Sequence, residues 1–134
     1  MTMIYLFDTN IIVEVFRQNA AIMQRINQLQ SQSSSYSLNA TTVGELFYGA
    51  YHSKRDVQTS LTQVTNLIQT TRILACDANT ANMYGEIRES LSAKGQMIPE
   101  NDIWIAASAK QYNLTLATRD AHFSRVDGLL IDQW

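Results

Sequence analysis

The sequence predicts a three-layer α/β/α sandwich, in which a mostly parallel sheet of four to five strands is covered by helices on both faces. Short, almost entirely apolar runs are typical of strands buried on both faces. They alternate with longer segments whose apolar residues recur every three or four positions, as in helices. Such alternation produces right-handed β-α-β units. A chain of 134 residues is long enough for one such domain, spanning residues 1–134.

Five segments are expected to form the strands. Residues 3–7 (MIYLF) give the clearest signal, because this run is nearly all apolar. The polar segment 30–37 (QSQSSSYS) is expected to be a solvated loop that enters the second strand. The other strands are expected at residues 36–38, 72–76, 114–117 and 129–131.

Helices are expected wherever apolar residues share one helical stripe. A last helix begins at about Pro99, since proline suits the first helical position. It contains the segment IWIAASA, which is apolar nearly all round and is therefore expected to be buried against the sheet, with Trp104 in the core. The earlier stripes are Ile22, Met23, Ile26 and Leu29; Leu46, Phe47, Ala50 and Tyr51; Val57, Leu61, Val64, Leu67 and Ile68; and Met83, Tyr84, Ile87 and Leu91.

Composition excludes several classes of protein. No apolar run approaches the length that spans a membrane, and the start MTMIYLFDTN lacks the features of a signal peptide. Cys76 is the only cysteine, so neither an internal disulfide nor a thiolate metal site is expected, and a cytoplasmic location follows. A net charge of -2 argues against a protein that coats nucleic acid, but not against an enzyme that acts on it.

Four acidic residues stand beside the expected elements, and each alone has a simple structural explanation. Asp8 directly follows the first strand, where it would cap the next helix. Glu45 lies three residues after Thr42, which is the spacing of a capping box. Asp102 falls in the first turn of the buried helix, where the helix dipole favours an acid. Asp120 follows the fourth strand and would cap a short helix.

The joint placement of these acids favours a shared site. In a parallel sheet the carboxyl ends of the strands lie along one edge, and ligands bind there at the point where strand order reverses. Asp8 and Asp120 are expected at strand ends, and Glu45 and Asp102 in first helical turns at the same edge. Repulsion among clustered carboxylates is relieved by a divalent cation. An all-oxygen ligand set suits Mg²⁺ or Mn²⁺ better than zinc.

Four segments in order resemble the PIN-domain family, and in particular the VapC-type toxins of bacterial toxin–antitoxin pairs. They are FDTN, ELFYGA, DIWIAA and TRDAHF, and the likeness extends over essentially the whole chain. The resemblance implies a PIN-like fold and a metal-dependent endoribonuclease that cuts a structured RNA, commonly a tRNA or an rRNA loop. It places the family's acids on Asp8, Glu45, Asp102 and Asp120, with Asp8 and Asp102 as the most direct metal ligands.

The resemblance also implies partners and supporting residues. Members are typically homodimers, and a cognate antitoxin segment covers the active site. Thr9 matches the small polar residue that follows the first acid, and Asn10 is expected to help through a hydrogen bond. The extra acid Glu100 departs from the family pattern and leaves its own role open.

The chemistry expected of this site is attack on a phosphodiester by metal-activated water, which leaves a 5′-phosphate and a 3′-hydroxyl. His52 and His122 are poor candidates for an acid–base pair, and His122 is interpreted as a capping or packing residue. Arg119 is the preferred phosphate contact among the basic residues, because it adjoins Asp120.

Alternatives remain open at this level. The same fold serves a non-catalytic binding module whose acids only cap helices, or a PIN nuclease that processes RNA or DNA and is not a toxin. The apolar helices around Leu46 and Val64 form either ordinary packing, a groove for the antitoxin, or the dimer seam.

Overall fold

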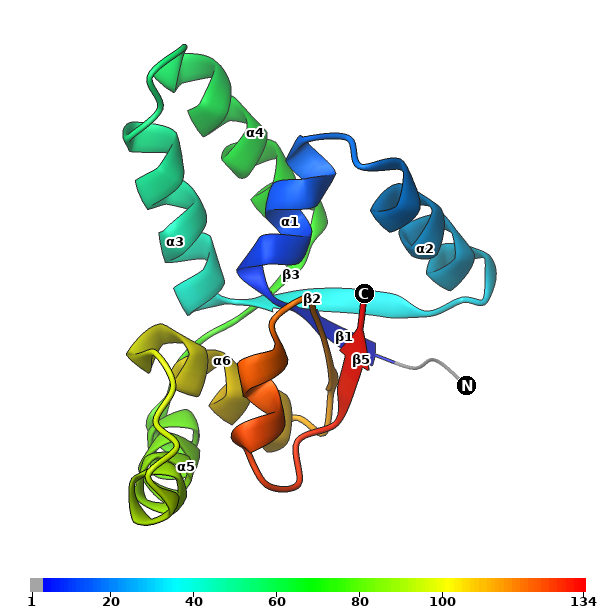
Figure 1. The fold of residues 1–134 in the computed structure, drawn as a ribbon. Helices are drawn as coiled ribbons and strands as arrows, with labels where there is room; N and C mark the ends of the chain where they lie inside the picture. The colour runs from blue at the N-terminus through cyan, green and yellow to red at the C-terminus, as the bar shows by residue number, and fades with distance from the viewer. Residues whose placement is uncertain (1–3) are drawn as a thin grey trace.

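A computed structural model describes residues 4–134 and contains a five-stranded, entirely parallel sheet in the order β3-β2-β1-β4-β5 (Figure 1). Helices cover both faces of this sheet, so the predicted three-layer α/β/α sandwich is confirmed. The strands are β1 (Ile4–Phe7), β2 (Ser35–Asn39), β3 (Arg72–Leu74), β4 (Thr115–Thr118) and β5 (Ile131–Gln133).

Within residues 4–134, six α-helices and one 3-10 helix connect the strands. Each of α2 to α5 begins at an Asn or Asp whose side chain accepts a hydrogen bond from a backbone N–H of the first turn, which explains where these helices start. None of the helices described is long and apolar enough to cross a membrane. They are α1 (Thr9–Phe16), α2 (Ala20–Ser31), α3 (Ala40–Tyr51), α4 (Val57–Thr70), α5 (Ala78–Lys94), α6 (Glu100–Gln111) and η1 (Ala121–Arg125).

Two hydrophobic cores lie on opposite faces of the sheet. Successive side chains of a strand point to opposite faces, so Tyr5 and Phe7 enter the core under α1 to α4, whereas Leu6 enters the core under α5, α6 and η1. Trp134 packs against Phe7 with ring centroids 5.0 Å apart. Because both cores contain side chains of β1, this strand lies between them at the centre of the molecule.

The strand order reverses between β1 and β4. The chain moves outward from β1 through β2 to β3, then returns by way of α5 and α6 to β4 on the other side of β1. Open α/β sheets bind ligands beyond the carboxyl ends of the strands at such a reversal. Asp8 follows β1 and Asp120 lies two residues after β4, so both acids stand at this position.

Several element boundaries differ from the sequence prediction. The first predicted residue of β1, Met3, lies outside the described residues. The segment 30–37 is only partly a loop, because α2 continues to Ser31 and β2 begins at Ser35. The strand predicted at 72–76 ends at Leu74, ahead of the cap of α5. The strand predicted at 129–131 runs over Ile131–Gln133, and Leu129 packs against the core instead.

Asn39 is expected to contribute strongly to stability, because its buried side chain caps the helix that carries Glu45. Its Oδ1 accepts a hydrogen bond from the N–H of Thr41 at 2.7 Å. Asn39→Ala should lower the free energy of unfolding by about 0.5–2 kcal/mol in urea denaturation. Asn66→Ala, in the exposed middle of α4, is the matched control and should have no such cost. Equal losses in the two variants would contradict the capping role.

Candidate active site

All four predicted acids line one cavity of about 650 Å³ at the carboxyl ends of β1 and β4. The cavity lies among the N-terminal ends of α1, α3 and α6, so segments far apart in sequence meet there (Figure 1). The complete lining comprises Asp8, Thr9, Asn10, Val13, Glu14, Arg17, Glu45, Pro99, Glu100, Asn101, Asp102 and Asp120. The expected convergence of the carboxylates is thus present in the structure.

Asp8 is the most deeply buried of these acids, with only 4% of its surface exposed. Its Oδ2 accepts a 2.7 Å hydrogen bond from the Thr118 hydroxyl, and its Oδ1 accepts a 2.8 Å bond from the Thr9 N–H. Burial raises the pKa of Asp8 to about 6, and the charges of Asp102 and Asp120 add to the rise, although both hydrogen bonds oppose it. A carboxylate held in this way is stabilised by a nearby positive charge.

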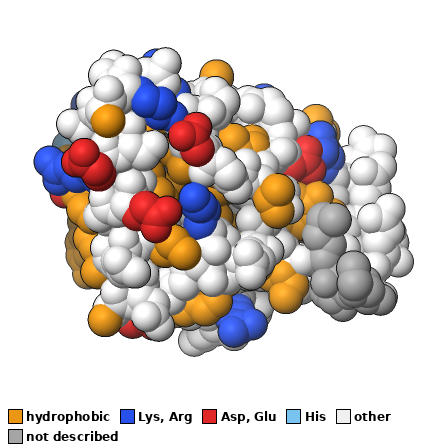
Figure 2. Space-filling view, turned by 90° about the horizontal axis from the view of Figure 1, so that it is seen from below, with side chains coloured by type: hydrophobic (Ala, Val, Ile, Leu, Met, Phe, Trp, Pro, Cys, Tyr) orange, Lys and Arg blue, Asp and Glu red, His pale blue; other side chains and the backbone are white. Residues whose placement is uncertain are grey.

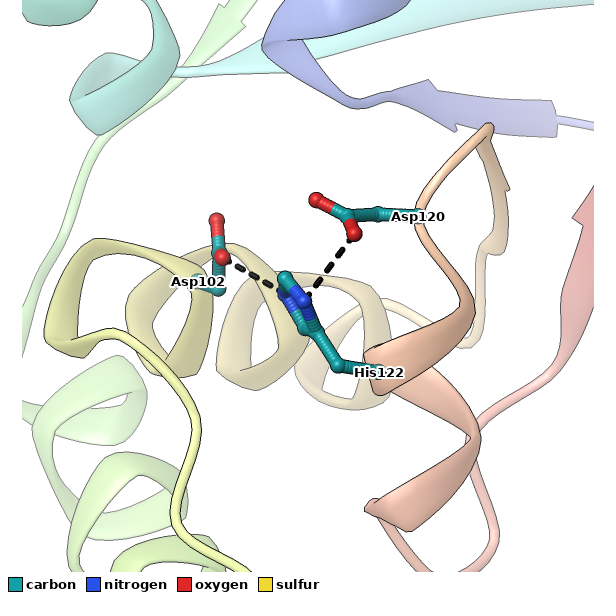
Figure 3. Close-up of side chains that lie close together, drawn as sticks. All are labelled: Asp102, Asp120 and His122. Carbon is teal, nitrogen blue, oxygen red and sulfur yellow. Dashed lines mark hydrogen bonds and ion pairs between the residues drawn. The ribbon is translucent and has the colours of Figure 1, made fainter.

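Asp102 and Asp120 approach each other from α6 and from the loop after β4, with His122 between them (Figure 3). His122 Nε2 lies 2.7 Å from Asp102 Oδ2, and its Nδ1 lies 3.0 Å from Asp120 Oδ1. Burial raises the pKa of Asp102, and the charges of Glu45 and Asp120 raise it further, although the His122 contact opposes this. The interpretation of His122 as a capping or packing residue is therefore incomplete.

The capping box predicted between Thr42 and Glu45 is wrong. Helix α3 begins at Ala40 and Asn39 is its cap, so Glu45 falls in the second turn instead of the first. The Glu45 carboxylate instead accepts a 2.7 Å hydrogen bond from the Thr9 hydroxyl of α1. This bond directs Glu45 into the cavity and joins two helices at its edge.

Asp120 does not cap η1 with its side chain, which makes no capping hydrogen bond. Instead, the backbone N–H of Asp120 donates a hydrogen bond to the Thr118 hydroxyl oxygen at 2.9 Å. Thr118 therefore contacts both strand-end acids, through its hydroxyl hydrogen to Asp8 and its oxygen to Asp120.

One face of α1 supplies polar residues to the cavity. Asn10, Val13, Glu14 and Arg17 all line it at helical spacing. The Asn19 amide donates to Glu14 at 3.0 Å and, together with Arg17, holds the pKa of Glu14 below its ordinary value. Glu14 and Arg17, whose charged groups lie 3.1 Å apart, form an ionic rim of the cavity.

Arg119 belongs to this rim without lining the cavity itself. Its Nη1 lies 3.6 Å from Glu14 Oε2, and the guanidinium is partly exposed. Over the face shown in Figure 2, Lys, Arg, Asp and Glu side chains are scattered without a patch of one sign. The rim therefore places positive charge beside the acids on a molecule with little net charge.

Three other residues singled out in the sequence differ in their surroundings. Glu100 lines the cavity, yet its carboxylate accepts from the Tyr84 hydroxyl and lies 3.4 Å from the Arg88 guanidinium. Asn10 Oδ1 is buried without a hydrogen-bond partner in the described part of the chain. Trp104 is half-buried and stacks on Tyr84, so it packs between α5 and α6 rather than deep in the core.

Sequence reasoning missed two residues that organise the site, Thr118 and Glu14. Glu14 carries a detectable signal, since it shares a helical face with Asn10 and Arg17. Thr118 carries none, because a threonine that ends a strand has no pattern that reveals which acid it meets.

The donor set fits a divalent cation. Asp102, Asp120 and His122 each offer a ligand atom, and these atoms lie within 4.8 Å of one another. Asp8 and Glu45 add two more carboxylates to the lining of the same cavity. Hard oxygen donors of this kind are typical of Mg²⁺ and Mn²⁺ sites.

Comparison with known proteins decides the family. A model of the PIN domain matches residues 5–129. The chain belongs to the PIN-domain family. It is similar to "Ribonuclease VapC2" of Haemophilus influenzae, with 33% identity over 132 residues that cover 97% of each chain. It is also similar, at 28% identity and 97% coverage of each chain, to the "tRNA(fMet)-specific endonuclease VapC" of Shigella flexneri.

Comparison with solved structures supports the same family. A crystal structure of VapBC2 from Rickettsia felis, bound to a DNA fragment from its promoter, superimposes with a TM-score of 0.90. It is 28% identical in sequence, and the match covers 98% of this chain and 99% of the other. The predicted resemblance to VapC-type PIN nucleases is thereby confirmed, and a cluster of acids of the kind used by divalent-metal nucleases is present in this PIN domain.

Because Asp8 is buried, we expect its ionisation to lower the stability of the metal-free PIN domain as pH rises. Because its folded pKa of about 6 exceeds the ordinary 3.8, its stabilising contribution is complete below about pH 4 and is lost as pH rises through about 6. In EDTA, Asp8→Asn should therefore raise the free energy of unfolding by up to about 3 kcal/mol at pH 7.5. At pH 4 the variant and wild type should be nearly equal.

Urea denaturation at the two pH values measures this difference. The control is Asp127→Asn, at an aspartate whose side chain is 77% exposed and lies 3.0 Å from the Lys94 ammonium. A gain for Asp8→Asn that is as large at pH 4 as at pH 7.5 would show that ionisation of Asp8 is not its cause.

Proposed function

We propose that this PIN domain is a metal-dependent endoribonuclease that acts as the toxin of a toxin–antitoxin pair. The observation that carries the proposal is the meeting of Asp8, Glu45, Asp102 and Asp120 around one cavity at the strand-order reversal. Membership of a family whose relatives are named ribonucleases supports RNA as the substrate class.

Mg²⁺ is the proposed cofactor, and Mn²⁺ is a suitable substitute. Asp8 and Asp102 would hold the ion most directly, with Glu45 and Asp120 completing the site. When bound, the ion acidifies water and neutralises the non-bridging oxygens of the phosphate. Thr118 and Thr9 hold Asp8 and Glu45 in place through 2.7 Å hydrogen bonds. Because water attacks and the ribose 2′-OH does not, the products would carry a 5′-phosphate and a 3′-hydroxyl.

The proposed partners follow from the relatives. A tRNA or an rRNA loop is the proposed substrate, and the similar protein of Shigella flexneri is named as a tRNA(fMet)-specific endonuclease. A cognate antitoxin that covers the cavity is proposed because the similar solved structures include VapBC complexes. A homodimer is proposed as the assembly, which light scattering of the purified chain tests directly.

The proposal predicts that RNA cleavage requires both the metal and the acids. Purified protein with Mg²⁺ should cut total tRNA or rRNA at discrete positions, and EDTA should abolish the cuts. Asp8→Asn and Asp102→Asn should each slow cleavage by at least about a hundredfold, because several kcal/mol of transition-state stabilisation depend on the metal. End-labelling of the fragments reads the position and the terminal groups.

Asp127→Asn is the control for the cleavage assay, because this exposed residue lies outside the cavity. Cleavage that persists in EDTA, or in both active-site variants, would refute the metal–carboxylate mechanism. Metal binding without cleavage of any RNA would favour a non-catalytic module, and cleavage of DNA would favour a processing nuclease.

Arg119 and Asn10 are the proposed substrate contacts, and Arg119 allows a quantitative test. In an Asp8→Asn background, which prevents cleavage, Arg119→Ala should weaken RNA binding and flatten the dependence of log K on log salt by about 0.7–1. Arg72→Ala is the control, since Arg72 is exposed at the amino end of β3, on the opposite edge of the sheet. An unchanged salt slope in Arg119→Ala would remove this residue from the phosphate contacts.

A further inference from the structure

His122 contacts two of the four acids, and the proposed function gives it no role so far. Its ring stands between two carboxylates, with Nε2 at 2.7 Å from Asp102 Oδ2 and Nδ1 at 3.0 Å from Asp120 Oδ1 (Figure 3). The side chain is only 19% exposed. Its neighbour Phe123 is fully buried and its ring lies 4.9 Å from the imidazole, so the short helix η1 is anchored and the ring has a fixed position.

This arrangement leaves one contact unexplained in a neutral imidazole. Such a ring has one N–H donor and one nitrogen lone pair. The N–H can serve only one of the two carboxylates. At the other contact, the second ring nitrogen and a carboxylate oxygen lie at hydrogen-bond distance, and this position can be filled by a second proton or by a cation.

The same geometry is characteristic of histidines that bind metals. A ligating histidine usually binds the ion through one ring nitrogen and donates its other N–H to a carboxylate, which fixes the tautomer and the ring orientation. Here both roles have a candidate partner, because the ligand atoms of Asp102, Asp120 and His122 lie within 4.8 Å of one another. The more exposed Asp120 suits the accepting role, and the half-buried Asp102 suits the metal.

We propose that His122 is a nitrogen ligand of the active-site cation. Its Nε2 binds the ion beside Asp102, and its Nδ1–H donates to Asp120. The inference rests on the proposed function, because it concerns the cation of that same site. It adds a donor outside the four acids, and it gives Asp120, through the oxygen that faces Nδ1, the additional role of positioning the imidazole.

A mixed nitrogen and oxygen site has a consequence for metal preference. Mg²⁺ favours oxygen ligands and retains its waters, whereas imidazole suits the first-row transition metals. The wild-type site should therefore bind Mn²⁺ in preference to Mg²⁺. Loss of the imidazole should reduce that preference by about tenfold, because it removes the donor that distinguishes the two ions.

The experiment uses Mn²⁺ alone as the probe. The sequence contains only two histidines, so nitrogen coupling to bound Mn²⁺ in pulsed electron paramagnetic resonance has few sources. Untagged wild-type protein should show imidazole ¹⁴N modulation, which ¹⁵N-histidine labelling converts to the ¹⁵N pattern. His122→Ala should lose the coupling and bind Mn²⁺ about 10–100-fold more weakly in calorimetry. Circular dichroism of the variant checks that it is folded.

His52→Ala is the matched control. His52 is exposed just beyond the end of α3, where it stacks on Tyr48, and it does not line the cavity. This variant should keep both the coupling and the affinity. Isotope labelling of the wild type together with this control decides the source of the nitrogen even if His122→Ala does not fold.

The outcomes separate the two proposals. Mn²⁺ that binds the wild type with no histidine coupling, while Asp8→Asn abolishes binding, would overturn ligation by His122 and leave the metal-dependent nuclease intact. Coupling that disappears in His52→Ala would also overturn it. Absence of any Mn²⁺ binding to the wild type would overturn both this inference and the proposed function.

Discussion

The repulsion among carboxylates gathered at one sheet edge is the constraint on which the rest of the site depends. Asp8 is almost completely buried, and the charges of Asp102 and Asp120, which line the same cavity, add to the rise of its pKa. Two hydrogen bonds to Asp8 oppose the rise of its pKa without cancelling it. The arrangement is therefore unfavourable for folding in isolation and favourable for a cation.

The fold keeps these carboxylates close together despite their repulsion, because each acid is attached to a strand end or a helix. Asp8 and Asp120 emerge from adjacent central strands, and Asp102 is in the first turn of a helix that is buried along most of its length. Glu45 is fixed by the Thr9 hydroxyl of a second helix and not by its own cap. Side chains held in this way cannot move apart to relax their repulsion, so the site is preorganised.

Positive side chains lie beside the acidic cavity. This local positive charge allows a protein with a negative net charge to act on a polyanion such as RNA. The net charge of the chain is -2, and basic and acidic side chains are scattered over the face shown in Figure 2. Glu14 orders Arg17 and Arg119 at the rim, at distances of 3.1 Å and 3.6 Å. A cation in the cavity would add positive charge where the phosphate must sit.

The sequence by itself determined the alternation of strands and helices, the buried helix α6 and the identity of the four acids, because periodicity and strand-end position are local properties. Local patterns misplaced Glu45, whose spacing from Thr42 imitates a capping box while Asn39 caps the helix. Only the tertiary structure decided that Thr118 holds Asp8 and that His122 stands between Asp102 and Asp120. Thr118 and Asp8 are separated by 110 residues, so their contact depends on β1 and β4 being neighbours in the sheet. That adjacency is set by the packing of two cores and not by any short segment.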